Sequence, residues 1–389
     1  MSALLPTYKQ ADLSFERGEG AYLYGTDGRR YLDFAAGIAV NSLGHSHPKL
    51  VAALAEQGAK LWHCSNLYRI PGQERLAERL VAHSFADRAF FCNSGAEAIE
   101  CGIKMIRKYH DDTGNPGRYR IICCNNGFHG RTLAAISAGG QAKHTKGFEP
   151  LVEGFDHVAF GNLNELRAAI TAETAGILVE PVQGEGGIIT ADPNYFRGLR
   201  AVSDEFGMLL FFDEVQSGMG RTGKLFAYEW WGVAPDIMAI AKGLGSGFPI
   251  GACLATERAA LGLTPGTHGS TFGGNPLAMA VANAVLDVML ADGFLDRVVH
   301  MGRRLRDRLA RTTAKYPKIL NEVRGLGLLI GLHCAVSNLE LQSRLRERGL
   351  LTATAGDNVV RILPPLIIGE KEVDEACAIL DETCAAWAA

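Results

Sequence analysis

The stretch MLLFFDEVQSGMGRTG (Met208–Gly223) decides the fold class. Five apolar residues, Met208–Phe212, lead directly into the carboxylate of Asp213, and a glycine-rich turn follows. A fully apolar run this short is typical of a strand that is buried on both faces, as in a parallel sheet covered by helices. Ligands bind beyond the carboxyl ends of such strands, so Asp213 stands where a ligand is expected.

The same pattern recurs on both sides of this stretch. Other short apolar runs that end in a polar or glycine-rich turn are Arg88–Cys92, Arg120–Cys124, Gly176–Glu180, Ile237–Ala241 and Ile250–Ala255. Apolar residues at helical spacing lie between them, as at Glu97–His110 and Pro193–Phe206. Alternating strands and helices indicate an α/β domain with a mostly parallel central sheet, helices on both faces and right-handed crossovers.

The ends of the chain have a different pattern. The segment YLYGTDGRRYLDF (Tyr22–Phe34) predicts a hairpin with Asp-Gly at its turn. The segment PGTHGSTFGGNP (Pro265–Pro276) is typical of a crossing between domains, and an α+β pattern follows it. We therefore predict three units: an N-terminal segment over 1–48, a large α/β domain over 49–275 and a small α+β domain over 276–389.

Composition excludes several classes of protein. The 389 residues carry 39 Lys and Arg against 42 Asp and Glu, a net charge of −3, so no global attraction to nucleic acid or membrane is expected. The sequence lacks the roughly 18-residue apolar run of a membrane helix and the apolar core of a signal peptide. Nine cysteines without a CxxC pair indicate buried, reduced thiols in a cytoplasmic protein and no metal site.

A candidate phosphate site follows the run that ends at Cys92. Ser94 and Glu97 have the spacing of a capping box, which predicts that a helix begins there. The backbone N–H groups of Ser94, Gly95 and Ala96 would then point out of a helix N-terminus, where an anion is favoured. A merely well-capped helix would show the same residues, so this motif alone leaves both interpretations open.

Asp213 and Lys242 are the other two candidates. A carboxylate after five apolar residues is expected to be buried and to need a partner, either a structural cation or a cationic ligand atom. Lys242 directly follows the run Ile237–Ala241, so it either reaches the surface or is a desolvated amine that forms a Schiff base. A phosphate site, a carboxylate for a ring nitrogen and an amine for an aldehyde together match pyridoxal phosphate.

A competing motif lies in GMGRTGKL (Gly218–Leu225), which matches GxGxxG and most of a Walker A loop. As a dinucleotide site it lacks a clear helix after the glycines. As a P-loop it has Leu225 where Ser or Thr would hold magnesium. The pyridoxal phosphate interpretation is therefore favoured.

With these residues the sequence resembles the class III pyridoxal-phosphate aminotransferases of fold type I, from about Arg17 to Leu366. The stretch FFDEVQSGMGRTG, continued through Asp236 and Ile237 to Lys242, is similar to the family signature. Four further motifs are most similar to the branch that transfers the terminal amine of N2-acetyl-L-ornithine to 2-oxoglutarate, in arginine biosynthesis. These motifs are FHGRT (Phe128–Thr132), QGEGG (Gln183–Gly187), HGSTFGGNP (His268–Pro276) and RILPPL (Arg361–Leu366).

The resemblance implies a place for each matching residue around the cofactor. Gly95 and Ala96 hold the phosphate, Asp213 pairs with the ring nitrogen, and Lys242 binds the aldehyde and later moves protons. Thr271 reaches the phosphate of the neighbouring subunit, which implies a homodimer.

Three more residues are implied to contact the cofactor ring. Phe128 stacks on one face of the ring and Val215 packs on the other. Gln216 hydrogen-bonds the ring hydroxyl.

The substrates carry carboxylates, which the planar guanidinium of arginine binds in a bidentate manner. By resemblance, Arg131 holds the α-carboxylate of acetylornithine with help from Ser270, and Arg361 holds that of glutamate. When the reacting amine is terminal, Glu185 is implied to pair with Arg361 and mask it. Each of these residues also has a plain structural interpretation as a salt bridge or loop anchor.

Ile38 bears on the donor. Related ornithine aminotransferases have a tyrosine near this place that contacts the free α-amine, which Ile38 cannot do, so an acylated amine fits better. N-succinyl-diaminopimelate, succinylornithine, ornithine and 4-aminobutyrate remain alternative donors. An aminomutase, a decarboxylase and a cofactor-binding protein without turnover are the readings from other classes.

Overall fold

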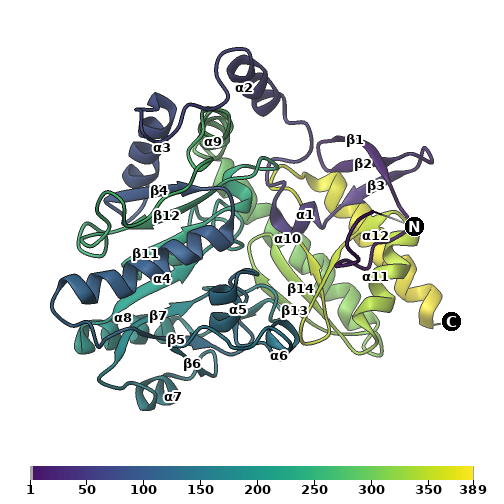
Figure 1. Ribbon diagram of the computed structural model, residues 1–389. Coiled ribbons are helices and arrows are strands. Elements are labelled where there is room, and N and C mark those ends of the chain that lie inside the picture. Colours follow the sequence, from purple (N-terminus) through teal and green to yellow (C-terminus); the bar gives the residue numbers. More distant parts are fainter. Residues whose placement is uncertain (1–2, 389) are drawn as a thin grey trace.

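The computed structural model describes residues 3–388, and its centre is a seven-stranded sheet of order β4-β12-β11-β10-β7-β5-β6 (Figure 1). These strands are β4 (Arg88–Cys92), β5 (Arg120–Cys124), β6 (Phe155–Val158), β7 (Thr174–Val179), β10 (Leu209–Asp213), β11 (Ile237–Ile240) and β12 (Gly251–Ala255). Every apolar run singled out in the sequence forms one of these strands, and only β6 was not predicted. The predicted α/β fold class is confirmed.

One strand of this mostly parallel sheet runs in the opposite direction. β5, β6, β7, β10 and β11 pair in parallel, whereas β12 is antiparallel to both β11 and β4. The expectation of a mostly parallel sheet is confirmed, and β12 is the exception because the connection 241–250 is shorter than the dozen or more residues that a parallel crossover needs. The chain turns back instead and pairs with the strand that it has just left.

Helices cover both faces of this sheet. Alternate residues of a strand point to opposite faces. Accordingly, Phe211 packs in the cluster that includes Ile99 of α4 (Gly95–Asp112), and Phe212 packs with Phe196 of α8 (Pro193–Phe206). Shorter helices on the sheet edges are α5 (Leu133–Gly139), α6 (Ala142–Thr145) and α7 (Leu163–Ala168). The central strands β7, β10, β11 and β12 are therefore buried on both faces, and their ends are where a ligand is expected.

A separate group of helices lies above β4 in Figure 1. It consists of α2 (Pro48–Gly58), α3 (Pro71–Ala82) and α9 (Pro276–Met289). α9 packs against both α2 and α3, and ten of its side chains are buried. α9 therefore joins the last third of the chain to helices formed by its first quarter.

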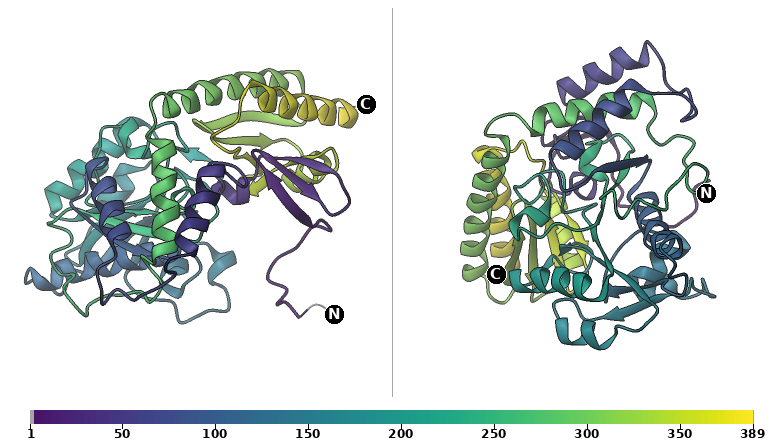
Figure 2. Two further views of the ribbon diagram at one scale, coloured as in Figure 1. Left: turned by 90° about the horizontal axis from the view of Figure 1, so that it is seen from above. Right: turned by 90° about the vertical axis from the view of Figure 1, so that its left-hand side faces the viewer.

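The C-terminal part forms a second, antiparallel sheet of order β13-β14-β17-β16. Its strands are β13 (Leu320–Leu326), β14 (Leu329–Cys334), β16 (Ala353–Ala355) and β17 (Val359–Ile362). α10 (Phe294–Lys315) and α12 (Glu370–Ala388) lie side by side along it in Figure 2, and α11 (Asn338–Glu347) packs nearby. This sheet carries Arg361 on β17.

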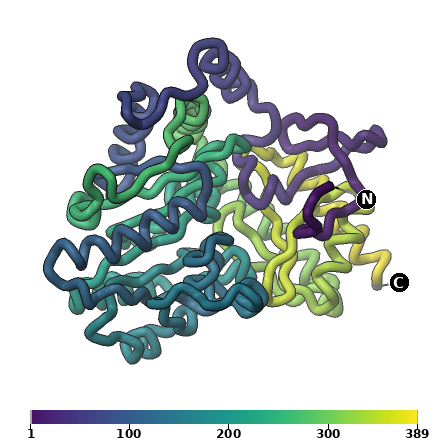
Figure 3. The backbone as a smooth tube through the Cα atoms, viewed as in Figure 1, coloured from purple at the N-terminus to yellow at the C-terminus, as the bar shows by residue number. Residues whose placement is uncertain are grey.

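The N-terminal hairpin joins the C-terminal part through a third sheet of order β1-β2-β3-β15. Its strands are β1 (Phe15–Glu19), β2 (Tyr22–Gly25), β3 (Arg30–Asp33) and β15 (Leu350–Leu351). The predicted hairpin is confirmed, with Asp27 and Gly28 in its turn. Figure 3 shows this first part of the chain running against the last part. The unit boundaries at 48 and 275 stay a prediction.

The remaining short elements lie close to the strand ends. They are α1 (Ala36–Ala39), β8 (Val182–Gln183), β9 (Ile189–Thr190) and two 3-10 turns at Ala227–Trp230 and Lys242–Leu244. Within residues 3–388, no single helix is long and apolar enough to cross a membrane, although α9 and α10, bent by 71°, meet that length and composition together. The same residues contain no group of three or more His, Cys, Asp or Glu placed to hold a metal ion.

Candidate active site

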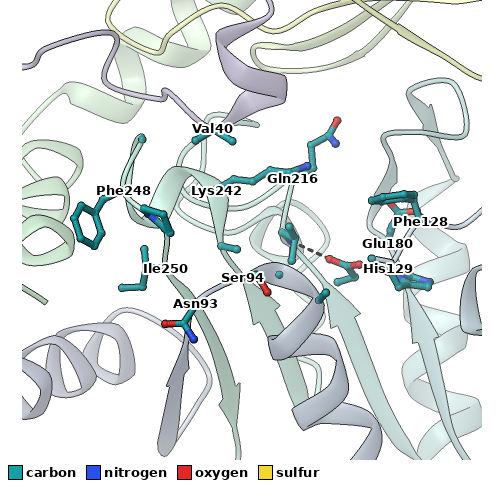
Figure 4. A pocket seen from close by; sticks show the side chains of 18 residues that line it. Val40, Asn93, Ser94, Phe128, His129, Glu180, Gln216, Lys242, Phe248 and Ile250 are labelled. Carbon is teal, nitrogen blue, oxygen red and sulfur yellow. Dashed lines mark hydrogen bonds and ion pairs between the residues drawn. The ribbon is translucent and has the colours of Figure 1, made fainter. Parts of the chain in front are cut away.

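A cavity of about 340 Å³ opens at the carboxyl ends of β4, β10 and β11. The predicted cofactor residues that line it are Ser94, Gly95, Ala96, Phe128, Asp213, Val215, Gln216 and Lys242. Figure 4 shows Phe128 and His129 on one side, Phe248 and Ile250 on the other, and Lys242 extending between them. The structure thus brings together residues that are spread over 148 positions of the sequence, from 94 to 242.

The N-terminus of α4 forms one wall of the cavity. Ser94 is its N-cap, and its hydroxyl accepts a hydrogen bond from the backbone N–H of Glu97 at 3.3 Å. The Glu97 carboxylate in turn accepts from the backbone N–H of Asn93 at 2.5 Å. The N–H groups of Gly95 and Ala96 belong to the first helical turn and have no acceptor within the helix. They are therefore available to an anion in the cavity.

Gly95 also has a steric reason to lack a side chain. A Cβ atom built on it would lie 2.7 Å from Cγ1 of Val215, which lines the same cavity. Only glycine lets the start of α4 and the residue after β10 approach this closely. The two walls of the cavity meet at this point.

Asp213 is buried, as the sequence predicts, and is 4% exposed. Its Oδ1 accepts from the backbone N–H of Val215 at 3.0 Å, and its Oδ2 lies 2.8 Å from Nδ1 of His129. A carboxylate only accepts hydrogen bonds, so Nδ1 of His129 carries the hydrogen. The pair holds the carboxylate in one orientation at the end of β10.

Lys242 opens the 3-10 turn directly after β11. Its φ of 43° lies in the left-handed region, which is uncommon for a residue with a side chain and is typical of functional sites. Desolvation, reinforced by the positive charge of Arg361, lowers the pKa of Lys242 to about 8. A substantial fraction of this amine is therefore neutral near physiological pH, which is the form that reacts with an aldehyde.

Glu180 is a cavity residue that the sequence analysis did not single out. It ends the predicted run Gly176–Glu180, and its carboxylate accepts from the backbone N–H groups of Phe128 at 3.1 Å and Gly184 at 3.4 Å. Desolvation and the nearby charge of Asp213 raise its pKa well above the ordinary value. Its position after an apolar run was the same signal that pointed to Asp213.

His129 is the other residue that was missed. It lies inside the quoted motif FHGRT, is buried, and lines the cavity next to Phe128. Its sequence signal was present, because the expected burial of Asp213 required a partner. No pattern in the sequence showed which residue that partner is.

Arg361 and Glu185 form an ion pair beside the cavity. Nη1 of Arg361 donates to Oε1 of Glu185 at 2.5 Å and to Oε1 of Gln216 at 3.3 Å, and Nη2 donates to the carbonyl of Thr354 at 2.8 Å. The Arg361 side chain is 2% exposed and that of Glu185 is 23% exposed. Arg361 therefore touches a cavity-lining residue, and Glu185 is the more accessible member of the pair.

Besides Arg361 and Glu185, three more predicted substrate or cofactor residues lie outside the cavity lining. Arg131 is exposed, with its guanidinium carbon 5.6 Å from the ring centre of Phe128. Ser270 accepts from the side-chain amide of Asn93, which does line the cavity, at 3.2 Å. Thr271 is exposed next to it. Thr271 lines a neighbouring hollow with Asn93 and Glu97 instead of the cavity itself.

The residues present fit pyridoxal phosphate. Backbone donors at a helix N-terminus suit its phosphate, the oriented carboxylate of Asp213 suits its ring nitrogen, and the lowered pKa of Lys242 suits its aldehyde. Residues 5–384 match the protein family described as aminotransferase class-III. The chain belongs to the class III aminotransferases. The family predicted from the sequence motifs is confirmed.

Relatives of known structure or name agree with this membership. The acetylornithine aminotransferase of Mesorhizobium japonicum is 59% identical over 375 residues, which cover 96% of this chain and 94% of that protein. The N-acetylornithine aminotransferase of Stenotrophomonas maltophilia is 39% identical, with a TM-score of 0.86 and 98% of each chain covered.

A third relative resembles the chain more in shape than in sequence. The ornithine aminotransferase of Toxoplasma gondii has a TM-score of 0.95 at 32% identity and covers 99% of this chain and 93% of its own. Another structure of that enzyme shows partial occupancy of pyridoxal phosphate at the active site.

Proposed function

We propose that this chain transfers the terminal amine of N2-acetyl-L-ornithine to 2-oxoglutarate, giving N-acetyl-L-glutamate 5-semialdehyde and L-glutamate. The observation that carries the proposal is the ion pair of Arg361 with Glu185, because it gives the site an arginine that one substrate uses and the other does not. The relative that is 59% identical and is named an acetylornithine aminotransferase supports the acetylated donor and a place in arginine biosynthesis.

The cofactor is pyridoxal phosphate, which supplies an aldehyde and an electron-accepting ring when it is bound. Gly95 and Ala96 donate backbone N–H groups to its phosphate. Asp213, oriented by His129, holds a proton on the ring nitrogen. Lys242 would bind the aldehyde through its neutral amine and, once the substrate amine has taken its place, its free amine could accept and return the proton of the reacting carbon.

The remaining cavity side chains hold the ring in place. Phe128 and Val215 both line the cavity and would close on opposite faces of the ring, while Gln216 would donate to the ring hydroxyl. The Oε1 atom of Gln216 already accepts from Arg361, so its amide nitrogen is the atom directed to the cofactor.

Substrate exchange works through Arg361. In the acetylornithine half-reaction, Glu185 neutralises this guanidinium, and Arg131 with Ser270 binds the distant α-carboxylate. In the glutamate half-reaction, Glu185 moves aside and the α-carboxylate of glutamate takes its place. Within residues 3–388, Nε of Arg361 has no hydrogen-bond partner, so the guanidinium keeps a donor for an incoming carboxylate.

The active unit is a homodimer in the cytoplasm. Large apolar side chains are exposed at Trp62, Leu67, Tyr68 and Phe272, and the two segments touch through the rings of His63 and Phe272. A surface of this kind on an otherwise ordinary protein marks a contact site. Thr271 lies on it and would reach the phosphate of the partner's cofactor. Light scattering of the purified protein checks the dimer; a monomer with full activity would contradict it.

Ornithine is the second candidate donor, because the Toxoplasma gondii ornithine aminotransferase superposes so well. Ile38, 41% exposed beside the cavity residue Val40, favours the acylated donor, since it offers no hydrogen bond to a free α-amine. N-succinyl-diaminopimelate, succinylornithine and 4-aminobutyrate are further candidate donors, to be compared in the absorbance experiment described next.

The absorbance of the pure protein tests the proposal directly. A yellow band that bleaches with N-acetyl-L-ornithine alone and returns with 2-oxoglutarate supports cofactor, donor and acceptor together. A yellow band that responds only to ornithine moves the substrate to the free diamine. A protein that stays colourless after addition of pyridoxal phosphate contradicts the proposal.

A further inference from the structure

Arg221 is a buried guanidinium without a carboxylate partner. It lies in the turn after β10, here called the signature turn (residues 214–223), and is 1% exposed. Its Nη1 donates to the carbonyls of Leu328 at 3.2 Å and Pro364 at 2.5 Å. Among the described residues, its Nε and Nη2 have no hydrogen-bond partner. Burying such a cation costs free energy, so its retention calls for a function.

The contact with Pro364 ties the signature turn to the segment that carries Arg361. Pro364 follows β17 directly after Leu363, and Arg361 is a residue of β17. At its other end the signature turn contacts the same segment again, because Gln216 accepts from Nη1 of Arg361. The turn and the strand are therefore joined at two points, Gln216 to Arg361 and Arg221 to Pro364.

The backbone of the turn is fixed as well. The carbonyl of Arg221 accepts from the N–H of Leu328 at 3.0 Å. Gly327 adopts a φ of 59°, and a Cβ on it would lie 2.3 Å from the carbonyl carbon of Thr222. The turn between β13 and β14 thus presses on the signature turn closely enough to require glycine. The backbone at Arg221 and Thr222 is thus held against the turn between β13 and β14.

We propose that Arg221 is a positioning residue that sets where the guanidinium of Arg361 stands relative to Gln216 and Lys242. Arg221 is not among the residues that line the cavity, so it acts through the strand. This inference rests on the proposed function, in which Arg361 binds the α-carboxylate of glutamate and 2-oxoglutarate. Desolvation lowers the pKa of Arg221 to about 9, which agrees with a site that no anion balances.

Half-reaction kinetics of Arg221→Met test this role. We expect the concentration of 2-oxoglutarate that gives half the maximal rate to rise about tenfold, because a misplaced clamp loses much of its binding. The corresponding value for N-acetyl-L-ornithine should change less than about threefold, since Arg131 serves that substrate. Arg221→Lys keeps a cationic donor and should restore most of the lost affinity.

Arg297→Met is the matched control. Arg297 also donates to two neighbouring carbonyls, those of Ile367 and Ile368, but within residues 3–388 it makes no hydrogen bond to the signature turn. Arg297→Met should lower the melting temperature, and any change in half-saturating concentration should be the same for the two substrates.

Two outcomes would overturn the inference. One is a lower melting temperature in Arg221→Met with unchanged half-saturation for both substrates. The other is a rise in the half-saturating concentration that is equal for both substrates in Arg221→Lys. This second outcome decides the matter if Arg221→Met does not fold. Arg361→Lys separates this from failure of the proposed function. If that variant leaves the 2-oxoglutarate half-reaction intact, the function assigned to Arg361 is wrong; if it weakens that half-reaction while Arg221→Met does not, only the inference fails.

Discussion

Nδ1 of His129 lies 2.8 Å from Oδ2 of Asp213, although 84 positions separate the two residues in the sequence. Both side chains are buried, with 1% and 4% of their surfaces exposed. The contact joins the turn after β5 to the end of β10. It leaves the carboxylate with a fixed direction before any cofactor arrives.

Replacement of His129 should weaken cofactor binding unless the new side chain can also donate a hydrogen bond to Oδ2 of Asp213. His129→Leu leaves Oδ2 of Asp213 unpaired in the protein interior, at a cost of about 1–3 kcal/mol of unfolding free energy. We expect a lower melting temperature and weaker binding of pyridoxal phosphate in titrations of the cofactor-free protein. His129→Asn retains an N–H donor near the position of Nδ1 and should retain most of both properties. Equal behaviour of the two variants would show that the hydrogen bond is unimportant.

The pKa of Lys242 predicts how cofactor uptake depends on pH. The rate at which cofactor-free protein takes up pyridoxal phosphate should rise with pH around a midpoint of about 8, because only the neutral amine reacts. Stopped-flow absorbance measures this rate. A midpoint near the ordinary lysine value of about 10.4 would contradict the desolvated environment.

The same group contributes to stability with a defined sign. The unfolded chain holds a proton on Lys242 up to about pH 10.4, whereas the folded chain releases it above about 8. The unfavourable contribution is therefore present below pH 8 and is relieved as the pH rises towards 10.4. Urea unfolding of the cofactor-free protein against pH should show this rise, and Lys242→Met should remove it.

Glu185→Gln should separate the two half-reactions. The amide cannot neutralise Arg361, so the guanidinium stays charged and uncompensated when the terminal amine of acetylornithine is bound. We expect a loss of about tenfold or more in the acetylornithine half-reaction and a much smaller loss with glutamate. Equal losses in single-turnover assays of both substrates would rule out the masking role.

Gly95→Ala tests the junction between the start of α4 and Val215. The new Cβ would lie 2.7 Å from Cγ1 of Val215, so the phosphate site or the ring contact must shift. We expect weaker binding of pyridoxal phosphate by about tenfold. Gly117→Ala is the control, because a Cβ on Gly117 meets no atom within 4 Å. Unchanged cofactor affinity in Gly95→Ala would exclude this part of the site from cofactor binding.

Sequence patterns predict those strands that are buried along most of their length, because such strands appear as continuous apolar runs. The bounds of β4 and β5 match their apolar runs to the residue, because both strands lie between two layers of helices. β6 escaped this reasoning because its run Phe155–Val158 contains Asp156 and His157, whereas β4, at the other edge of the sheet, is apolar from Ala89 to Cys92. Asp156 pairs with Arg120 on the neighbouring strand, so the polar residue belongs to the sheet edge.

The candidate site divides in the same way. Asp213 and Lys242 were predictable because a charge after an apolar run is conspicuous. The pairing of Asp213 with His129, and of Arg221 with two carbonyls of the C-terminal part, depends on which loops meet in space. A single sequence does not show which loops meet, so the partners of Asp213 and Arg221 emerged only from the structure, whereas Glu180 carried the same sequence signal as Asp213.

The reversed direction of β12 has a consequence for Lys242. Because β12 runs back along β11, the connection 241–250 both leaves and re-enters the sheet at the edge where the cavity opens. Lys242 therefore lies in a short loop whose two ends are held in place by the hydrogen bonds between β11 and β12. Phe248 and Ile250 lie in the second half of this loop, just before β12. With a crossover helix in place of this loop, the position of Lys242 would depend on a helix that lies outside the sheet. In the short loop, the two paired strands fix the position of the Lys242 amine directly. Lengthening this loop by even a few residues should let the amine move out of the cavity.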